Sequence, residues 1–503
     1  MVDSVRTVQI KKAPRDLKLN WRLHSLLKIS SAFPRGSRGE SIVVKKISVC
    51  AAMVAVACVS LHAQVTLLAK GTLTGSSAGS YQDLSGLHYT LENGVPANLL
   101  GGLGSGLTYA GGNTFLAIPD RGPNAVSFNS NVDDTVAYVN RFQTVSMQLT
   151  PNKSSSGLPF TLTPTLRSTT LLHALLPLTY GSGKGLDIIP GKPPINTLLK
   201  HYFTGRSDGF DPEHNSGDPF NARLDPESIR VSNDGLTVFI SDEYGPYVYQ
   251  FLRATGQRIR TYTVPADFFV ANPKPTGDAE QAANNTGRVP NKGMEGLAIT
   301  PDGRTLVGIM QNALIQDAAE GGDAVNLLRI VTIDILSGRT THQYAYLLTT
   351  GSGVSEITAL NDHEMIVDER DGKGLGDGSK AKVKQLFKID LKGATDVSNM
   401  DGTAAAAHAV SKTLFLDVVD LLGKNGITPD QIPAKIEGVS FGPDVKVNGK
   451  TVHTVWVAND NDFLQDFSGP NTNPNQFFVF GFTDADLGGS VYVPQPHFSL
   501  FGW

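Results

Sequence analysis

The sequence predicts an all-β protein built as a β-propeller, with six blades and five as the alternative. A short signature recurs five times: an acidic or small residue opens one strand, and charged or amide groups end the next strand. Successive copies are 122, 68, 61 and 81 residues apart, a period typical of repeat architectures. Glycine occurs 52 times and charged residues make up only 18% of the chain, which suits an all-β fold dense in turns.

Each copy predicts a β-hairpin. Two short runs alternate apolar and polar residues and are joined by turns such as Asn233-Asp234-Gly235. A unit of this length has room for about four strands, as a propeller blade has. The five copies are Gly104–Gly122, Pro226–Gly245, Met294–Asn312, Ser355–Gly372 and Ile436–Asp462. Because the first gap is double, a degenerate sixth copy is expected near Gly183–Pro190.

The segments outside the copies also have expected places. The apolar runs Val65–Leu73 and Gln476–Phe482 are expected to pair within one blade, since the ring closes only if the two ends of the chain meet. The stretches Gly205–Phe220 and Asn272–Gly293 are polar and rich in Gly and Pro, which indicates loops on one face of the propeller. Few helices are expected, Thr413–Gly423 among them.

The first 63 residues are expected to lie outside the propeller domain, which would span residues 64–503. Residues 44–63 have the layout of a signal peptide: Lys45-Lys46, the apolar run Ile47–Leu61 and a small residue before Gln64. The apolar run is short for a membrane-spanning helix. A membrane anchor and a lipoprotein site at Cys58 are the alternatives. Residues 1–43 are interpreted as a non-native extension ahead of the true translation start.

Cysteine usage and charge indicate the setting and the partners. Both cysteines, Cys50 and Cys58, lie in the expected signal peptide, so the mature chain would contain none. That pattern points to an exported protein, periplasmic or extracellular, of bacterial type. Residues 64–503 carry 32 Lys and Arg against 44 Asp and Glu, a net charge near −12, which disfavours nucleic acid as a partner. We expect a monomer that binds a small-molecule ester and does not insert stably into a membrane once the signal peptide is cleaved.

The charged groups of the five copies are expected to converge. In a propeller the first strand of each blade lines the axis, so equivalent positions meet at one end of the central channel. The predicted ring comprises Asp120, Arg121, Glu227, Asp242, Glu243, Glu295, Gln311, Glu356, Asp368, Glu369, Arg370, Glu437, Asn459 and Asp460. Grouped carboxylates need compensating cations, and oxygen ligands without thiolates select Ca²⁺ or Mg²⁺; we expect Ca²⁺. The alternative is that each carboxylate only accepts N–H groups in its own turn.

A family resemblance accompanies these motifs. The strings DPESIRVS, SDEYGPYVYQF, NKGMEGLAITPDG, DERDG and KIEGVSFGP resemble the phytase-like domain family, also called the esterase-like activity of phytase family, over Leu99–Asp466. The resemblance implies an exported propeller related in architecture to the calcium-dependent β-propeller phytases. Those enzymes release phosphate from inositol phosphates with metal-bridged carboxylates. The phosphate-binding Lys and Arg residues of true phytases are not matched one by one in this sequence.

We therefore expect a metal-dependent hydrolase of phosphate monoesters, with Arg121, Glu295 and Arg370 as catalytic residues. The expected metal ligands are Asp120, Glu227, Asp242, Glu243, Glu356, Asp368, Glu369, Glu437, Asn459 and Asp460. Bound Ca²⁺ would lower the pKa of a water, and the guanidinium groups would neutralise charge on the phosphoryl oxygens. For each arginine, a salt bridge within its own acidic run is the alternative role.

Two other functions stay open at this point. One is hydrolysis of a carboxylic ester or lactone at an axial calcium, and the other is non-catalytic binding by a propeller that calcium rigidifies. Phosphate ester chemistry favours several cations beside the metal, and the sequence places few in the ring.

Overall fold

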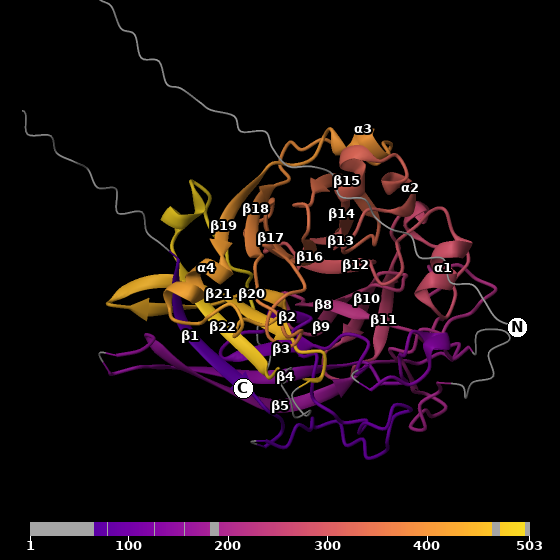
Figure 1. Cartoon of the computed structure of the whole chain (residues 1–503), viewed down its shortest axis with the longest axis horizontal. Coiled ribbons are helices and arrows are strands. Elements are labelled where there is room, and N and C mark those ends of the chain that lie inside the picture. The colour runs from indigo at the N-terminus through magenta and orange to yellow at the C-terminus, as the bar shows by residue number, and fades with distance from the viewer. Residues whose placement is uncertain are drawn as a thin grey trace, which may run out of the picture. The chain divides into compact units, whose positions relative to one another are not determined.

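The computed structural model describes residues 65–77, 79–124, 126–154, 156–181, 191–464 and 473–497. They belong to one compact unit, Leu61–Trp503. Five four-stranded antiparallel sheets form the blades of a β-propeller (Figure 1). The predicted fold class is confirmed, and the number of blades is five, the alternative, rather than six. The expected signal peptide and the sixth copy near Gly183–Pro190 lie outside the described residues.

In the first three blades the strands run outward from the channel in chain order. The first blade comprises β2 (Gly106–Tyr109), β3 (Thr114–Ile118), β4 (Arg141–Pro151) and β5 (Phe160–Leu171). The second comprises β8 (Pro226–Val231), β9 (Thr237–Asp242), β10 (Val248–Leu252) and β11 (Arg258–Tyr262). The third comprises β12 (Met294–Ile299), β13 (Thr305–Met310), β14 (Leu327–Asp334) and β15 (Thr340–Leu347).

The fourth blade follows the same order and comprises β16 (Gly353–Ala359), β17 (Glu364–Arg370), β18 (Lys384–Asp390) and β19 (Lys412–Asp417).

The fifth blade joins the two ends of the propeller. The fifth combines β20 (Lys435–Val447), β21 (Lys450–Asp460) and β22 (Asn475–Phe482) with β1 (Thr66–Leu73) as its outermost strand. β1 runs antiparallel to β22, from Thr66 opposite Gly481 to Leu73 opposite Asn475. The expected pairing of the two terminal apolar runs is therefore confirmed.

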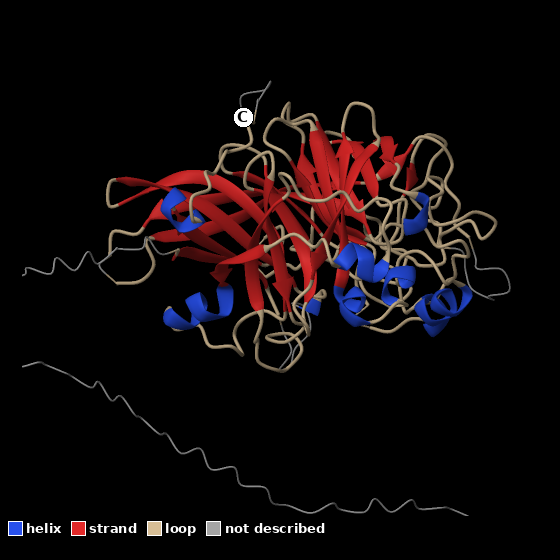
Figure 2. Cartoon of the chain, turned by 90° about the horizontal axis from the view of Figure 1, so that it is seen from above, coloured by secondary structure: helices blue, strands red, loops and turns tan. Residues whose placement is uncertain are grey.

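Helices are few and short, and they lie at the edges of the strands (Figure 2). The α-helices are α1 (Gly277–Ala283), α2 (Ile315–Ala318), α3 (Gly402–Ala406) and α4 (Val418–Lys424). The 3₁₀ turns are η1 (Ser130–Val132), η2 (Ala266–Phe268), η3 (Gly322–Asn326) and η5 (Asp484–Leu487). The helix expected at Thr413–Gly423 is wrong in its first half, which belongs to β19. In the described part of the chain, no helix is long and apolar enough to cross a membrane.

The double-length first gap is explained without a sixth blade. β4 and β5 contain 11 and 12 residues, roughly twice the length of the strands in the second blade. They are followed by a separate two-stranded sheet of β6 (His173–Ala174) and β7 (His201–Tyr202). Together these elements occupy much of the sequence between the first and second copies.

The inner strands close a ring of five. β2 contacts β8, β8 contacts β12, β12 contacts β16, β16 contacts β20, and β20 contacts β2 (Figure 1). A separate apolar core fills the space between each pair of neighbouring blades. Between the first and fifth blades, for example, the rings of Phe115 and Trp456 lie 4.5 Å apart. Each such large buried side chain contributes about 1.5–3 kcal/mol to folding.

A buried ion pair crosses the channel and ties the blades together; we call it the axial ion pair. Arg230 Nη2 lies 2.9 Å from Glu356 Oε2, and both residues are buried. Arg230 also donates to backbone carbonyls, those of Leu107, Ile229, Ile357 and Val439. Glu356 accepts from the Leu297 N–H at 3.2 Å. These partners lie on β2, β8, β12, β16 and β20, so one pair of side chains connects all five inner strands.

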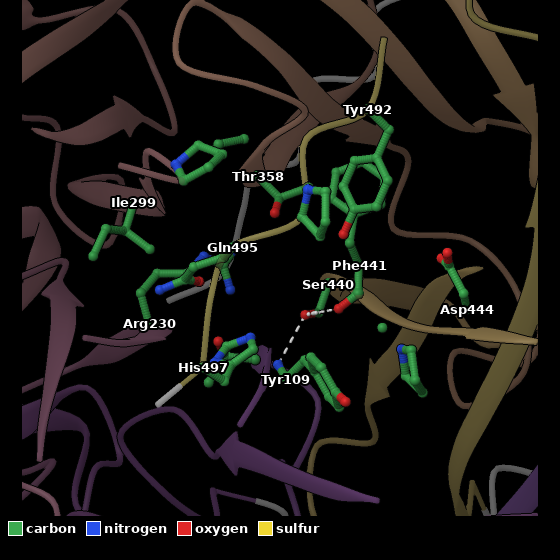
Figure 3. Close-up of a pocket in the computed structure, with 16 residues that line it drawn as sticks. Tyr109, Arg230, Ile299, Thr358, Ser440, Phe441, Asp444, Tyr492, Gln495 and His497 are labelled. Carbon is green, nitrogen blue, oxygen red and sulfur yellow. Dashed lines mark hydrogen bonds between the residues drawn. The ribbon is translucent and has the colours of Figure 1, made fainter. Parts of the chain in front are cut away.

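The C-terminal segment 483–497 covers the far mouth of the channel, where the inner strands end. Gln495 Nε2 donates to the carbonyl of Val231 at 2.8 Å and to Asn233 Oδ1 at 2.7 Å. Below the segment lies a cavity of about 150 Å³ whose lining includes Arg230 and Tyr109 (Figure 3). The axial ion pair therefore separates this covered mouth from the opposite one, where the inner strands begin.

Candidate functional site at the acidic mouth

The inner strands begin at the mouth opposite the C-terminal segment, and four of them start with a β-bulge. In the third blade Met294 pairs with Met310 and Gly296 with Ile309, which leaves Glu295 as the extra residue. The same irregularity places Glu227 and Glu437 at corresponding positions in the second and fifth blades. In these three blades the bulge thus presents one acidic side chain at the mouth.

In the fourth blade the residue at this position is Ser355 and not Glu356, which corrects the predicted ring. Val354 pairs with Glu369 and Glu356 with Asp368, so Glu356 occupies the position that Gly296 holds in the third blade. In the third blade a Cβ on Gly296 would lie 2.6 Å from the Ile357 backbone nitrogen, so only glycine fits there. The Glu356 carboxylate instead lies deeper in the channel and forms the axial ion pair.

Three predicted ring members near the ends of the second strands face away from the mouth. Asp242, Glu369 and Asn459 hold corresponding places in β9, β17 and β21. Because side chains alternate along a strand, the residue that follows each of them is the one that faces the mouth. Those residues are Glu243, Arg370 and Asp460. A one-residue offset therefore separates the two groups.

These three side chains make their hydrogen bonds and ion pairs away from the acidic mouth. Asp242 accepts the backbone N–H groups of Asp225 at 3.0 Å, Tyr244 at 3.0 Å and Gly245 at 2.9 Å. Glu369 is paired with Lys412 and accepts from the Tyr346 hydroxyl. Asn459 Oδ1 accepts the Gln476 N–H at 2.6 Å, and its amide donates to the Pro474 carbonyl. Asp242 and Asn459 thus stabilise their own blades, and Glu369 links the fourth blade to Tyr346 of the third.

Seven carboxylates do meet at the mouth, and we call them the acidic cluster. Its members are Asp120, Asp225, Glu227, Glu243, Glu295, Glu437 and Asp460. Gln311 lies beside Glu295 at the same level. The predicted residue Asp368 lies near Arg370 and Glu437 and is buried, with no hydrogen-bond partner for either oxygen among the described residues.

Three cations lie within the cluster, each paired with a carboxylate, and Lys435 is paired with a second one, Asp462. Arg121 Nη1 lies 3.0 Å from Asp225 Oδ2, and the backbone N–H of Arg121 donates to Asp225 Oδ1 at 2.9 Å. Lys435 Nζ lies 2.8 Å from Asp460 Oδ2. Arg370 is paired with Glu437. Both arginines lie at the mouth, but neither is paired within its own acidic run, because Asp225 and Glu437 come from other segments of the chain. The carboxylates still outnumber the cations.

The tightest group within the cluster is formed by Asp225, Glu227 and Glu243. One oxygen from each carboxylate lies within 4.8 Å of an oxygen of the other two. Glu295 lies next to Glu243, and its Oε2 is buried without a hydrogen-bond partner among the described residues. Three acidic side chains of the second blade therefore meet, with Glu295 of the third blade beside one of them.

Burial and mutual repulsion raise the pKa values of these carboxyls. Burial, and then the neighbouring carboxylates, place the pKa of Glu227 and that of Glu295 well above the usual range. Burial raises the pKa of Glu437 to about 7, although Arg370 opposes the shift. A cation bound among these groups would reverse the shifts, because an opposite charge nearby favours the ionised form.

Two residues at the acidic mouth, Asp225 and Lys435, were not predicted from the sequence. Each stands two positions before a predicted residue, Asp225 before Glu227 and Lys435 before Glu437. The period of two in a strand brings such pairs to the same side, so this spacing was the signal that could have identified them.

Comparison with known families gives one match that covers most of the chain. The family model Phytase-like, described as esterase-like activity of phytase, matches residues 98–463. These bounds include all seven members of the acidic cluster and both residues of the axial ion pair.

Individual relatives are more distant. An uncharacterized secreted protein of Arthroderma benhamiae is 30% identical in an alignment over 321 residues that covers 56% of this chain and 59% of that protein, so the chain spans less than two thirds of its length. The PQQ-bound aldose sugar dehydrogenase of Streptomyces coelicolor is 11% identical, with a TM-score of 0.30 over 83% of this chain and 97% of that one. Hydrazine synthase of Kuenenia stuttgartiensis is 13% identical, with a TM-score of 0.28 over 78% of this chain and 88% of that one.

Proposed function

This chain belongs to the phytase-like family, and from that premise we propose that it is an exported, calcium-dependent hydrolase of phosphate monoesters. The observation that carries the proposal is the meeting of Asp225, Glu227 and Glu243 within 4.8 Å beside Arg121. Export is supported by the signal-peptide pattern of residues 44–63 and by the secreted relative.

The donor set fits Ca²⁺. Ca²⁺ binds carboxylate oxygens at about 2.3–2.6 Å, so two oxygens on one ion lie at most roughly 5 Å apart. The three carboxylates meet that limit, and the unpartnered Oε2 of Glu295 lies beside them. The acidic cluster contains neither thiolate nor imidazole, so its ligand chemistry is that of a hard cation.

The mechanism assigns distinct tasks to the residues at the mouth. Calcium, when bound by Asp225, Glu227 and Glu243, supplies charge that polarises a phosphoryl oxygen and acidifies a water. Arg121 and Arg370 orient the phosphoryl group and neutralise the charge that grows on its outer oxygens. Glu295 Oε2, which has no hydrogen-bond partner among the described residues, would accept the proton of the attacking water.

Calcium is expected to stabilise the fold more strongly as the pH rises. Between the ordinary value of 4.5 and about 7, the folded protein without calcium holds more protons at Glu437 than the unfolded chain. Its free energy of unfolding therefore falls as the pH rises through this window. Glu227, one of the proposed ligands, also has a raised pKa without calcium, so a bound ion would displace its proton too. The gain in melting temperature that calcium causes should therefore be larger at about pH 8 than at about pH 5. Thermal melts with Ca²⁺ and with a chelator at both pH values measure this, and an equal gain would contradict calcium binding at the acidic cluster.

One observation favours a second candidate function, the hydrolysis of a carboxylic ester or lactone. Arg121, Arg370 and Lys435 are already paired with carboxylates, so the mouth keeps an excess of negative charge that would repel a phosphate. Assays of p-nitrophenyl phosphate and p-nitrophenyl acetate with Ca²⁺ separate the two functions. We expect cleavage of the phosphate ester, and cleavage of the acetate alone would favour the second candidate.

A further inference from the structure

Four exposed leucines gather on the small sheet that lies in the sequence between the first and second blades. The sheet consists of β6 and β7, which run antiparallel with Ala174 opposite His201. Beyond this pair the two chains continue past the same end of the sheet, one just after β6 and the other just before β7. The side chains there are 46%, 60%, 88% and 65% exposed, for Leu175, Leu176, Leu198 and Leu199 in turn. We call these four residues the leucine knob.

The second half of the knob is held in a fixed turn. The Thr197 N–H donates to the carbonyl of Lys200 at 2.9 Å, which closes the turn around the two leucines between them. The Tyr202 N–H donates to Asn196 Oδ1 at 3.1 Å and anchors the base of the turn to β7. A leucine that is 88% exposed projects from the surface. Large apolar side chains that are exposed together mark a surface that a partner or a membrane covers.

The knob lies in a locally cationic part of the chain. Lys192 and Lys200 are exposed beside it, and the ranges 172–181 and 191–204 contain no Asp or Glu. Residues 64–503 as a whole have a net charge near −12. At physiological salt, charges more than about 8 Å apart are largely screened, so an anionic surface that touches the knob meets its lysines before the overall charge of the protein.

This combination fits a lipid surface better than a protein partner. Protein interfaces are depleted in Lys, and their packing requires a partner of complementary shape. A projecting turn with leucines at its tip and lysines beside them can instead enter a bilayer without a matching pocket. The leucines then contact acyl chains, and the lysines contact anionic headgroups.

We propose that the leucine knob docks the exported protein reversibly onto a membrane surface that contains anionic lipids. Leu198 and Leu199 enter the boundary between headgroups and acyl chains, while Lys192 and Lys200 bind the headgroups. None of these residues belongs to the acidic cluster, so docking leaves the acidic mouth free for a substrate. The proposal goes beyond the proposed hydrolysis and does not depend on it.

The first test measures vesicle binding by Gln64–Trp503, the form expected after cleavage of the signal peptide, which contains all the described residues. The protein is cosedimented with vesicles of phosphatidylcholine and phosphatidylglycerol. A chelator is present so that no calcium bridges the acidic cluster to the lipid. We expect saturable binding that rises with the phosphatidylglycerol content and falls as salt is added. Absent binding would overturn the proposal.

The leucines are tested with L198A and with the matched control L336A, in the turn between β14 and β15. Leu198 and Leu336 are 88% and 89% exposed, so neither substitution should affect folding. L198A should weaken vesicle binding severalfold, and L198A/L199A at least about tenfold, because less apolar area enters the bilayer. L336A should bind as the wild type does. Equal binding by L198A and L336A would rule out the knob as the docking element.

The lysines are tested with K192A/K200A. This variant should lose most of the dependence on phosphatidylglycerol and keep weak binding to phosphatidylcholine alone. K392A/K450A removes two exposed lysines elsewhere and is the control with the same change in charge. An equal loss in both variants would show that overall charge governs binding, which contradicts a specific role of the knob.

A gain of signal separates a lipid from a protein partner. The added tryptophan of L198W should shift its emission to the blue with vesicles and be quenched by brominated acyl chains, whereas that of L336W should not. Without vesicles, sedimentation should show the same oligomeric state for the wild type and L198A. A dimer that L198A dissociates would overturn the proposal in favour of a contact between two copies of the chain.

Discussion

Replacing Arg230 by methionine is expected to lower the free energy of unfolding by about 3–5 kcal/mol, since removing one partner of a buried ion pair leaves the other charge uncompensated. Glu356 would remain in the channel without its partner, and the carbonyls of Leu107, Ile357 and Val439 would lose their donor. Because these groups lie on inner strands of different blades, the loss should affect the whole ring. Urea denaturation followed by tryptophan fluorescence measures it.

The matched control is R339M, which removes an exposed arginine from the third blade. Substitutions at exposed positions usually change stability by less than about 0.5 kcal/mol, so this variant should unfold near the wild-type midpoint. A midpoint for R230M close to that of R339M would show that the axial ion pair does not connect the blades.

Replacing Glu227 or Glu295 by glutamine is expected to lower the calcium-dependent activity at least about a hundredfold. Even the loss of a residue that only hydrogen-bonds to a metal ligand lowers metal affinity or activity roughly 10–100-fold. Glu227 belongs to the trio that fits the ion, and Glu295 Oε2 is the proposed proton acceptor. Initial rates of phosphate release with Ca²⁺ measure the loss for each variant.

These two substitutions should leave the fold intact. Burial and neighbouring carboxylates raise the pKa of both groups, so a neutral amide of the same shape relieves repulsion in the protein without calcium. Melting temperatures in chelator should therefore equal or exceed that of the wild type. E213Q, at an exposed position in the loop before β8, is the control and should keep full activity. Wild-type rates for both E227Q and E295Q would remove these residues from the reaction.

The propeller was predictable because its signals are local and repeated. Alternation and a turn indicate each hairpin, and the pairing of β1 with β22 follows from ring closure. The number of blades was harder to predict from the sequence. A gap of double length predicts an extra blade, whereas long strands such as β4 and β5 and the separate β6–β7 sheet take up sequence there.

The acidic mouth was predictable as a whole but not in every member. Aligning the glutamates of the copies placed Glu356 with Glu295, whereas the bulge aligns Ser355 with it. A one-residue offset turns a side chain to the other side of a strand, as it also does at Glu369 and Arg370.

The most direct measurement of the central claim is phosphate release from inositol hexakisphosphate by the purified protein, with added Ca²⁺ and with a chelator. The proposed function predicts release that requires Ca²⁺ and stops when the ion is removed. No release with Ca²⁺, or release that the chelator leaves unchanged, would contradict a calcium-dependent phosphate monoester hydrolase.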